Sequence, residues 1–226
     1  IACVAEDCSD TEGFTGATVV SCPEGLISPA LINAHDHITY TGNAPKAHTA
    51  KYDHRHEWRE GAGVDKPKIP VPQTDGAESW GELRNIMGGA TSMFGSGEGT
   101  GLLRNLDKAD GLLPGIPTTR KATYNTFPLS DSNGTMLTSG CAYSSIVTTS
   151  SVAAMTCFVP HVAEGVNEAA RNEFRCLSSS DNGGQDLTQM NTSFIHGVGL
   201  KAVDIRDMFT SGTGLVWSPR SNVDLY

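Results

Sequence analysis

The feature that most constrains the fold is an apolar run that ends in two histidines. Residues 26–34 are almost continuously apolar, which is typical of a buried strand in a parallel sheet. His35 and His37 follow directly, and side chains two positions apart on a strand point to the same side. Ligands bind at the carboxyl ends of strands in open parallel sheets. The sequence therefore predicts that these two imidazoles together hold a metal ion.

Two further histidines follow strand-like runs. His161 lies in the segment 158–164, which closes with Glu164, and His196 comes directly after the apolar pair 194–195. A single histidine in such a place is more often a hydrogen-bonded core or surface residue than a ligand. Here four of the seven histidines occupy strand ends, and this joint placement predicts that they meet at one edge of the sheet.

The other three histidines lie in a long polar stretch, residues 41–78, where prolines discourage regular structure. We expect His48, His54 and His56 to be solvated or to face a substrate rather than to bind metal. The segment 53–59 concentrates charge around one tryptophan. Two interpretations stay open for it: a loop that overhangs the site and grips a substrate, or an ordinary solvated loop or subunit contact.

After this stretch the chain alternates between strand-like and helix-like segments. Expected strands are residues 90–94, 121–129, 156–159, 193–195 and 214–217, and expected helices are 79–87, 102–106, 166–177 and 199–209. Such alternation predicts an α/β fold with a parallel sheet and helical crossovers. Short β segments at 1–4 and 17–22 indicate that residues 1–25 are the remnant of a small β module, followed by one main domain at 26–226.

Composition narrows the classes of ligand and partner that the chain is expected to bind. The formal charge is −9 without a run of Lys or Arg, which argues against a nucleic-acid partner. No stretch is apolar for long enough to cross a bilayer, so we expect no membrane partner. A small-molecule substrate is the natural ligand, and a homo-oligomer is compatible with the sequence.

The six cysteines leave two interpretations open. One is an oxidising compartment, periplasmic or secreted, in which Cys141 bridges to Cys176 and Cys8 bridges to Cys22. The other is a set of buried free thiols, which a cytoplasmic protein also carries. Cys157 lies beside a predicted site strand, but no His–Asp arrangement marks it as a nucleophile.

Four segments, taken together, resemble one family. Residues 28–37 resemble the first-strand signature of the amidohydrolase superfamily. Residues 161–164 resemble the fifth-strand His-x-x-Glu of its cytosine-deaminase-like, chlorohydrolase and guanine-deaminase branch. His196-Gly197 resembles the sixth-strand histidine of that branch, and residues 217–222 resemble its seventh-strand Pro-x-Ser-Asn element. The four segments occur in the family's order and span nearly the whole chain.

The resemblance implies a (β/α)8 TIM-type barrel with one divalent metal ion, zinc or alternatively iron. It implies that Glu164 shuttles a proton and that His196 polarises the attacking water or the substrate. The implied metal ligands are His35, His37 and His161, and the implied substrate contacts are Trp217, Arg220 and Asn222. No lysine lies between Lys121 and His161, which disfavours the binuclear sites that use a bridging lysine.

The sequence departs from the family pattern after the seventh-strand element. The family's metal-binding aspartate follows an eighth strand, and Asp224 comes too early to take its place. We therefore expect an incomplete barrel that a C-terminal segment or a second chain completes. The expected function is metal-dependent hydrolysis of a C–N bond, as deamination of a nitrogen heterocycle or hydrolysis of a cyclic amide. The alternative is a catalytically incomplete barrel that serves as a binding or assembly subunit.

Overall fold

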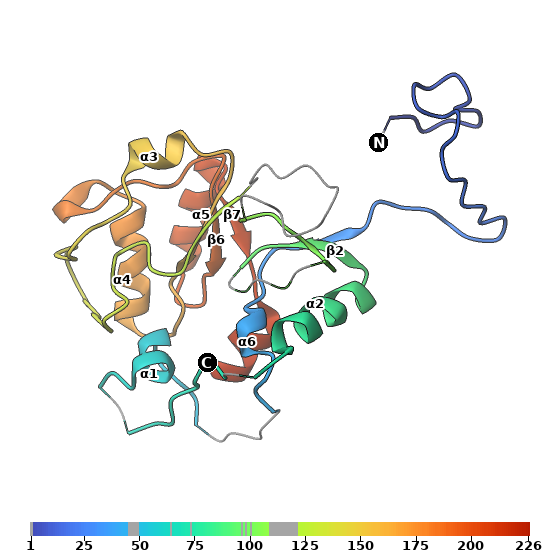
Figure 1. Ribbon diagram of the computed structural model, residues 1–226. Helices are drawn as coiled ribbons and strands as arrows, with labels where there is room; N and C mark the ends of the chain where they lie inside the picture. Colours follow the sequence, from blue (N-terminus) through green and yellow to red (C-terminus); the bar gives the residue numbers. More distant parts are fainter. Residues whose placement is uncertain are drawn as a thin grey trace.

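The computed structural model describes residues 2–44, 50–63, 65–72, 74–95, 97, 99, 101–108 and 122–226. Within these ranges the protein is an α/β fold with parallel sheets (Figure 1). The strands are β1 (Leu31–Asn33), β2 (Ala90–Met93), β3 (Arg104–Asn105), β4 (Thr123–Asn125), β5 (Phe158–Val162), β6 (Ser193–His196) and β7 (Gly214–Val216). The predicted alternation of strands and helices is confirmed at this level.

The strands form two sheets in which every neighbour runs parallel. One sheet has the order β1-β2-β3 and the other has the order β4-β5-β6-β7, so both follow the sequence. In the second sheet His161 is paired with Ile195 and Val162 with His196. This register brings the carboxyl ends of β5 and β6 to the same edge, as the strand-end argument requires.

Helices follow most of the strands. They are α1 (Arg55–Glu60), α2 (Ala77–Met87), α3 (Thr149–Ala153), α4 (Glu168–Leu177), α5 (Ala202–Ser211) and α6 (Pro219–Leu225), with 3-10 turns at Ile38–Tyr40 and Asp181–Gly183. In α4 the Asn167 side chain accepts a hydrogen bond from the Ala170 N–H and caps the first turn. The buried face of α4 carries Phe174 and Leu177 on helical spacing.

One apolar cluster connects the two sheets. Each strand, or the residue just before or beyond its end, contributes to it: the members are Ala34, Phe94, Leu106, Ala122, Tyr124, Cys157, Val159, Ile195 and Val216. The Ala122 N–H also donates to the Leu106 C=O at 2.9 Å, so the backbone links β3 to β4. A larger core lies between the second sheet and α4, around Phe158, Phe174 and Phe194. The two sheets therefore share one apolar cluster.

Two disulfides tie the chain. Cys141 is bonded to Cys176, as the sequence suggested. The expected bond between Cys8 and Cys22 is wrong, because Cys8 is bonded to Cys3 and Cys22 is free and exposed. Among the described residues, no helix combines the length and the apolar character that a bilayer-spanning helix needs.

The first strand differs from its prediction. Only Leu31–Asn33 forms a strand in the run 26–34, and the Leu31 and Ile32 side chains are 65% and 60% exposed. Among the described residues β1 pairs only with β2, and the described residues 2–30 do not pack over it. Those residues contain no strand or helix and run away from the packed elements in Figure 1, so the strands expected at 2–4 and 17–22 are absent. Ile1 lies outside the described residues.

Two other segments depart from the sequence prediction. Residues 102–106 were expected to form a helix, but they contain β3, whose parallel pairing with β2 sets their conformation. The polar stretch 41–78 contains α1, whose side chains from Arg55 to Trp58 are buried. The prolines therefore do not keep the whole of this stretch irregular.

Candidate metal centre

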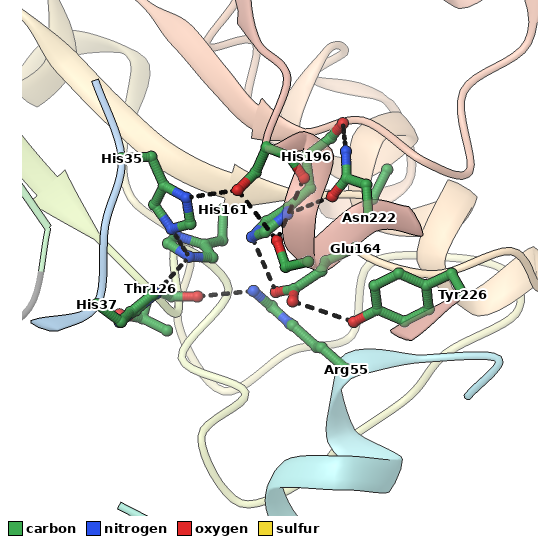
Figure 2. A network of polar contacts seen from close by, with 12 residues as sticks. His35, His37, Arg55, Thr126, His161, Glu164, His196, Asn222 and Tyr226 are labelled. Carbon is green, nitrogen blue, oxygen red and sulfur yellow. Dashed lines mark hydrogen bonds and ion pairs between the residues drawn. The ribbon is translucent and has the colours of Figure 1, made fainter. Parts of the chain in front are cut away.

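Four imidazoles from three strand ends lie together (Figure 2). The Nε2 atom of His161 lies 3.1 Å from Nε2 of His35 and 3.0 Å from Nε2 of His37. The ring centre of His196 lies 4.9 Å from that of His35 and 4.9 Å from that of His161. The structure thus brings together all four histidines that the sequence placed at strand ends.

Local backbone geometry aims these side chains. His35 and His37 lie just beyond β1, and the Asp36 N–H donates to the Phe94 C=O, which holds this segment against the end of β2. On β5 and β6, Ala163 and His196 adopt positive φ angles of 55° and 77°. Left-handed backbone at a residue other than glycine is strained and is concentrated at functional sites. At these two strand ends it redirects the chain so that Glu164 and His196 face the other imidazoles.

Burial favours the neutral form of all four rings. Burial lowers the pKa of His35, His37 and His161 well below the usual range, and neighbouring positive groups lower it further. After burial, the Arg59 guanidinium is the largest cause at His37. Burial also lowers the pKa of His196. A neutral imidazole keeps a nitrogen lone pair, which is the form that binds a metal.

The nitrogen atoms fit a divalent cation. His161 Nε2 contacts the Nε2 atoms of both His35 and His37, but one hydrogen on it can bond to only one of them. A cation between the rings would instead use the lone pairs of all three nitrogens. In tetrahedral zinc sites with bonds of about 2.0–2.1 Å, ligand nitrogens lie about 3.3 Å apart. The spacings of 3.0 and 3.1 Å are close to that value. The Nδ1 atom of His161 is buried without a partner.

The geometry adds His196 to the ligand set. His35, His161 and His196 offer ligand atoms that all lie within 4.8 Å of one another. His37, which the resemblance placed among the ligands, lies 3.0 Å from His161 Nε2 and 3.0 Å from the Tyr124 hydroxyl. The residues that could hold a metal ion are thus His35, His161 and His196, with His37 in contact with His161 beside them.

Glu164 lies at the edge of this cluster. Its Oε2 atom is 3.5 Å from His196 Nε2, and its Oε1 atom accepts a hydrogen bond of 3.0 Å from the Tyr226 hydroxyl. Trp58 Nε1 donates in turn to the Tyr226 oxygen at 2.9 Å. The carboxylate is thus fixed through one oxygen, and its other oxygen faces His196.

Two residues of the 217–222 element orient the histidines from behind. Asn222 Nδ2 donates to the His196 backbone C=O, which leaves its Oδ1 atom 2.7 Å from His196 Nδ1. The Nδ1 atom therefore carries the hydrogen, and Nε2 presents its lone pair to the site. Ser218 Oγ lies 3.1 Å from His35 Nδ1 in the same way. Second partners of this kind fix the tautomer and orientation of metal-binding histidines.

A cavity of about 480 Å³ opens above the cluster. It is lined by His35, His37, Glu164 and His196, and further by Tyr40, Trp58, Arg59 and Trp80. Of the three expected substrate contacts, Arg220 lines the cavity, whereas Trp217 is half-exposed and does not. Asn222 is buried against His196, where it orients the ring. A neighbouring hollow of about 520 Å³ around Thr39 and Thr74 has no histidine among its described lining residues.

A second polar cluster lies beneath the site and corrects the expectation for two histidines. His54 and His56 are 1% and 0% exposed, so they are not solvated. His54 Nε2 lies 3.3 Å from Glu173, and His56 Nε2 lies 2.8 Å from Asp131. The buried guanidinium of Arg55 contacts both carboxylates, at 2.6 and 3.0 Å. Because this cation already occupies the space between the acids, the cluster is a poor place for a metal ion. His48 lies outside the described residues.

Sequence reasoning missed the groups that hold the site in place. Tyr124 is the last residue but one of β4, as His161 is of β5, so the strand-end argument applied to polar side chains of any type would have selected it. Arg55 Nη1 donates to the Thr126 C=O, and Thr126 Oγ1 donates to the Tyr124 oxygen. No local pattern marks these long-range contacts.

No protein-family model, no curated protein and no solved structure matches the chain. The functional argument therefore depends on the site's own geometry.

Proposed function

We propose that the protein is a metal-dependent hydrolase of the amidohydrolase type that cleaves a C–N bond in a nitrogen heterocycle or cyclic amide. One observation carries the proposal: buried imidazoles from two strand ends lie at nitrogen spacings of 3.0 and 3.1 Å, with His196 from a third strand end and a carboxylate beside them. Catalytic zinc sites combine three protein ligands with an open position, and an open cavity lies over this cluster.

Each residue then has a task. His35, His161 and His196 would hold the ion, and His37 would complete or support the set. A divalent ion lowers the pKa of a water molecule that it binds. Glu164 takes a proton from the attacking water at Oε2 and returns it to the departing nitrogen, so that a C–O bond forms as the C–N bond breaks. Tyr226 keeps the carboxylate in place for both transfers.

The proposal includes a (β/α)8-type barrel. Parallel strands in sequence order and an apolar cluster shared by both sheets support it. An eighth strand, from whichever segment supplies it, would lie between β7 and β1, whose outer edges have no partner among the described residues. The two disulfides support an oxidising compartment, outside the cytoplasm.

The test is an activity screen with metal control. The protein is stripped with EDTA, reloaded with Zn²⁺ or Fe²⁺, and assayed for ammonia release from purines, pyrimidines and triazines and for ring opening of cyclic amides. We expect Glu164→Gln to keep the metal and to lose about 10²–10⁴-fold in rate. Glu168→Gln, at an exposed glutamate of α4, is the matched control. A stoichiometric metal without turnover of any compound would favour the binding-subunit alternative, and turnover that survives both EDTA and Glu164→Gln would refute the mechanism.

A further inference from the structure

We propose that Arg59 binds a carboxylate of the substrate, so that the substrates are C–N compounds that carry a negatively charged group. This proposal rests on the proposed function for the bond that is cleaved, and on independent observations for the charge. Arg59 lies in the last turn of α1 and lines the cavity together with His35, His37 and Glu164. The helix is fixed to the site strand, because the Arg55 N–H donates to the Glu164 C=O at 3.0 Å.

Two aromatic rings orient the guanidinium of Arg59. Its central carbon lies 4.5 Å from the centre of the Trp58 ring and 5.4 Å from that of Phe127. Stacking uses the faces of the guanidinium and leaves its in-plane N–H groups available for two parallel bonds to a carboxylate. The Nε atom of Arg59 is buried and has no hydrogen-bond partner.

Arg59 differs from most of the other arginines in its ion pairing, although Arg220 likewise has no carboxylate partner among the described residues. Within the part of the chain that the structure describes, five arginines have a carboxylate within ion-pair distance: Arg55, Arg84, Arg171, Arg175 and Arg206. Arg59 has none there, although it is only partly exposed. A stacked, partly buried cation without a counter-ion in a substrate cavity is typical of an anion-binding residue.

The charged residues of the cavity also favour an anionic substrate. Its described lining residues include three arginines, Arg59, Arg84 and Arg220, and three acids, Asp36, Glu164 and Asp224. The charges of these six side chains cancel one another. A divalent cation held by the histidines of the site would therefore leave the cavity with two surplus positive charges. A substrate carboxylate next to Arg59 would compensate one of them.

The walls indicate the shape of the rest of the substrate. Tyr40, Trp58 and Trp80 supply aromatic surface to a cavity of about 480 Å³. Flat rings pack well on such surfaces. A ring compound with a carboxylate substituent matches both the aromatic walls and Arg59.

The test compares a matched pair of ring compounds, orotate and uracil, which differ by one carboxylate. Binding is measured by calorimetry on the metal-free full chain, so the result does not depend on metal loading or turnover. We expect orotate to bind about tenfold or more tightly than uracil, because charge-assisted hydrogen bonds are worth about 1.5–3 kcal/mol. Arg59→Gln should bring this ratio close to one, and Arg59→Lys should keep part of it.

Arg206→Gln is the control, because this arginine lies on α5, is exposed and does not line the cavity. It should leave the ratio unchanged. The proposal is overturned if wild-type protein binds the two compounds equally, if orotate does not bind at millimolar concentration, or if Arg59→Gln keeps the preference. If Arg220→Gln abolishes the preference while Arg59→Gln keeps it, Arg220 binds the carboxylate in place of Arg59, and the proposal is likewise overturned. A zinc titration of the same samples reports separately on the metal centre.

Discussion

His35 and His161 are 126 positions apart in the chain, yet their Nε2 atoms lie 3.1 Å from each other. Two neutral imidazole nitrogens at this distance share at most one hydrogen, whereas a cation between them uses both lone pairs. Each ring comes from the carboxyl end of a different strand, one in each sheet. The pair therefore links the two sheets at the point where we place the metal ion.

Removing the Asn222 side chain should weaken metal binding without removing a ligand. Asn222→Ala leaves His196 Nδ1 without its acceptor, so the ring is free to turn and to change tautomer. Loss of such partners costs about 10–100-fold in metal affinity. Zinc affinity, measured by competition with a chromophoric chelator, checks this. Asp207→Asn, at an exposed position of α5, should bind zinc like wild type, and an unchanged affinity in Asn222→Ala would contradict the role given to Asn222.

Stability should depend on pH through Asp131. Burial would raise the pKa of Asp131, but the Arg55 guanidinium and the His56 hydrogen bond outweigh it and hold the pKa at about 2. The unfolded value is about 3.9. Because the folded pKa is the lower one, this stabilisation is fully present above about pH 4 and is lost as the pH falls towards 2.

The matching experiment is urea unfolding of wild type and Asp131→Asn at several pH values. The difference in unfolding free energy should shrink by about 2 kcal/mol between pH 6 and pH 2, because protonation removes the charge that the variant already lacks. Parallel curves for the two proteins would show that Asp131 titrates normally in the folded state.

The disulfide between Cys141 and Cys176 should contribute strongly to stability. It closes a loop with a sequence separation of 35 residues, and both cysteines belong to the core around Phe174. The chain-entropy estimate for such a loop is about 4 kcal/mol. We expect the Cys141→Ser, Cys176→Ser double variant to lose about this much unfolding free energy in urea.

The second disulfide provides the control. Cys3 and Cys8 are only 5 residues apart, and none of the described residues 2–30 belongs to a core cluster. The Cys3→Ser, Cys8→Ser variant should therefore unfold like wild type. Equal losses in the two double variants would mean that the N-terminal segment packs on the core.

Local patterns were enough to bring the four histidines of the candidate site together, because each lies at or just beyond a strand end. His35, His37, His161 and His196 follow apolar runs, and apolar runs report strand ends without knowledge of the partner. α4 was predicted for the same reason, because its apolar residues keep helical spacing. The assignment among the four rings was harder, since the choice between His37 and His196 as third ligand depends on three-dimensional distances.

Local sequence patterns could not predict other parts of the structure. Arg55 meets Asp131 at a separation of 76 residues, and no spacing rule connects a charged polar stretch to acids that far away. The helix expected at 102–106 forms β3 because pairing with β2 overrides its apolar spacing. The Cys8 pairing failed because connectivity does not follow from cysteine spacing alone.

The most direct test of the account is a zinc count. EDTA-treated protein is dialysed to equilibrium against Zn²⁺ and analysed by inductively coupled plasma mass spectrometry, with folding checked by circular dichroism. We expect one zinc per chain in wild type and in His56→Asn, which alters the lower cluster, and none in His161→Ala. A full equivalent of zinc retained by His161→Ala, or no zinc bound by wild type, would contradict the proposed metal centre.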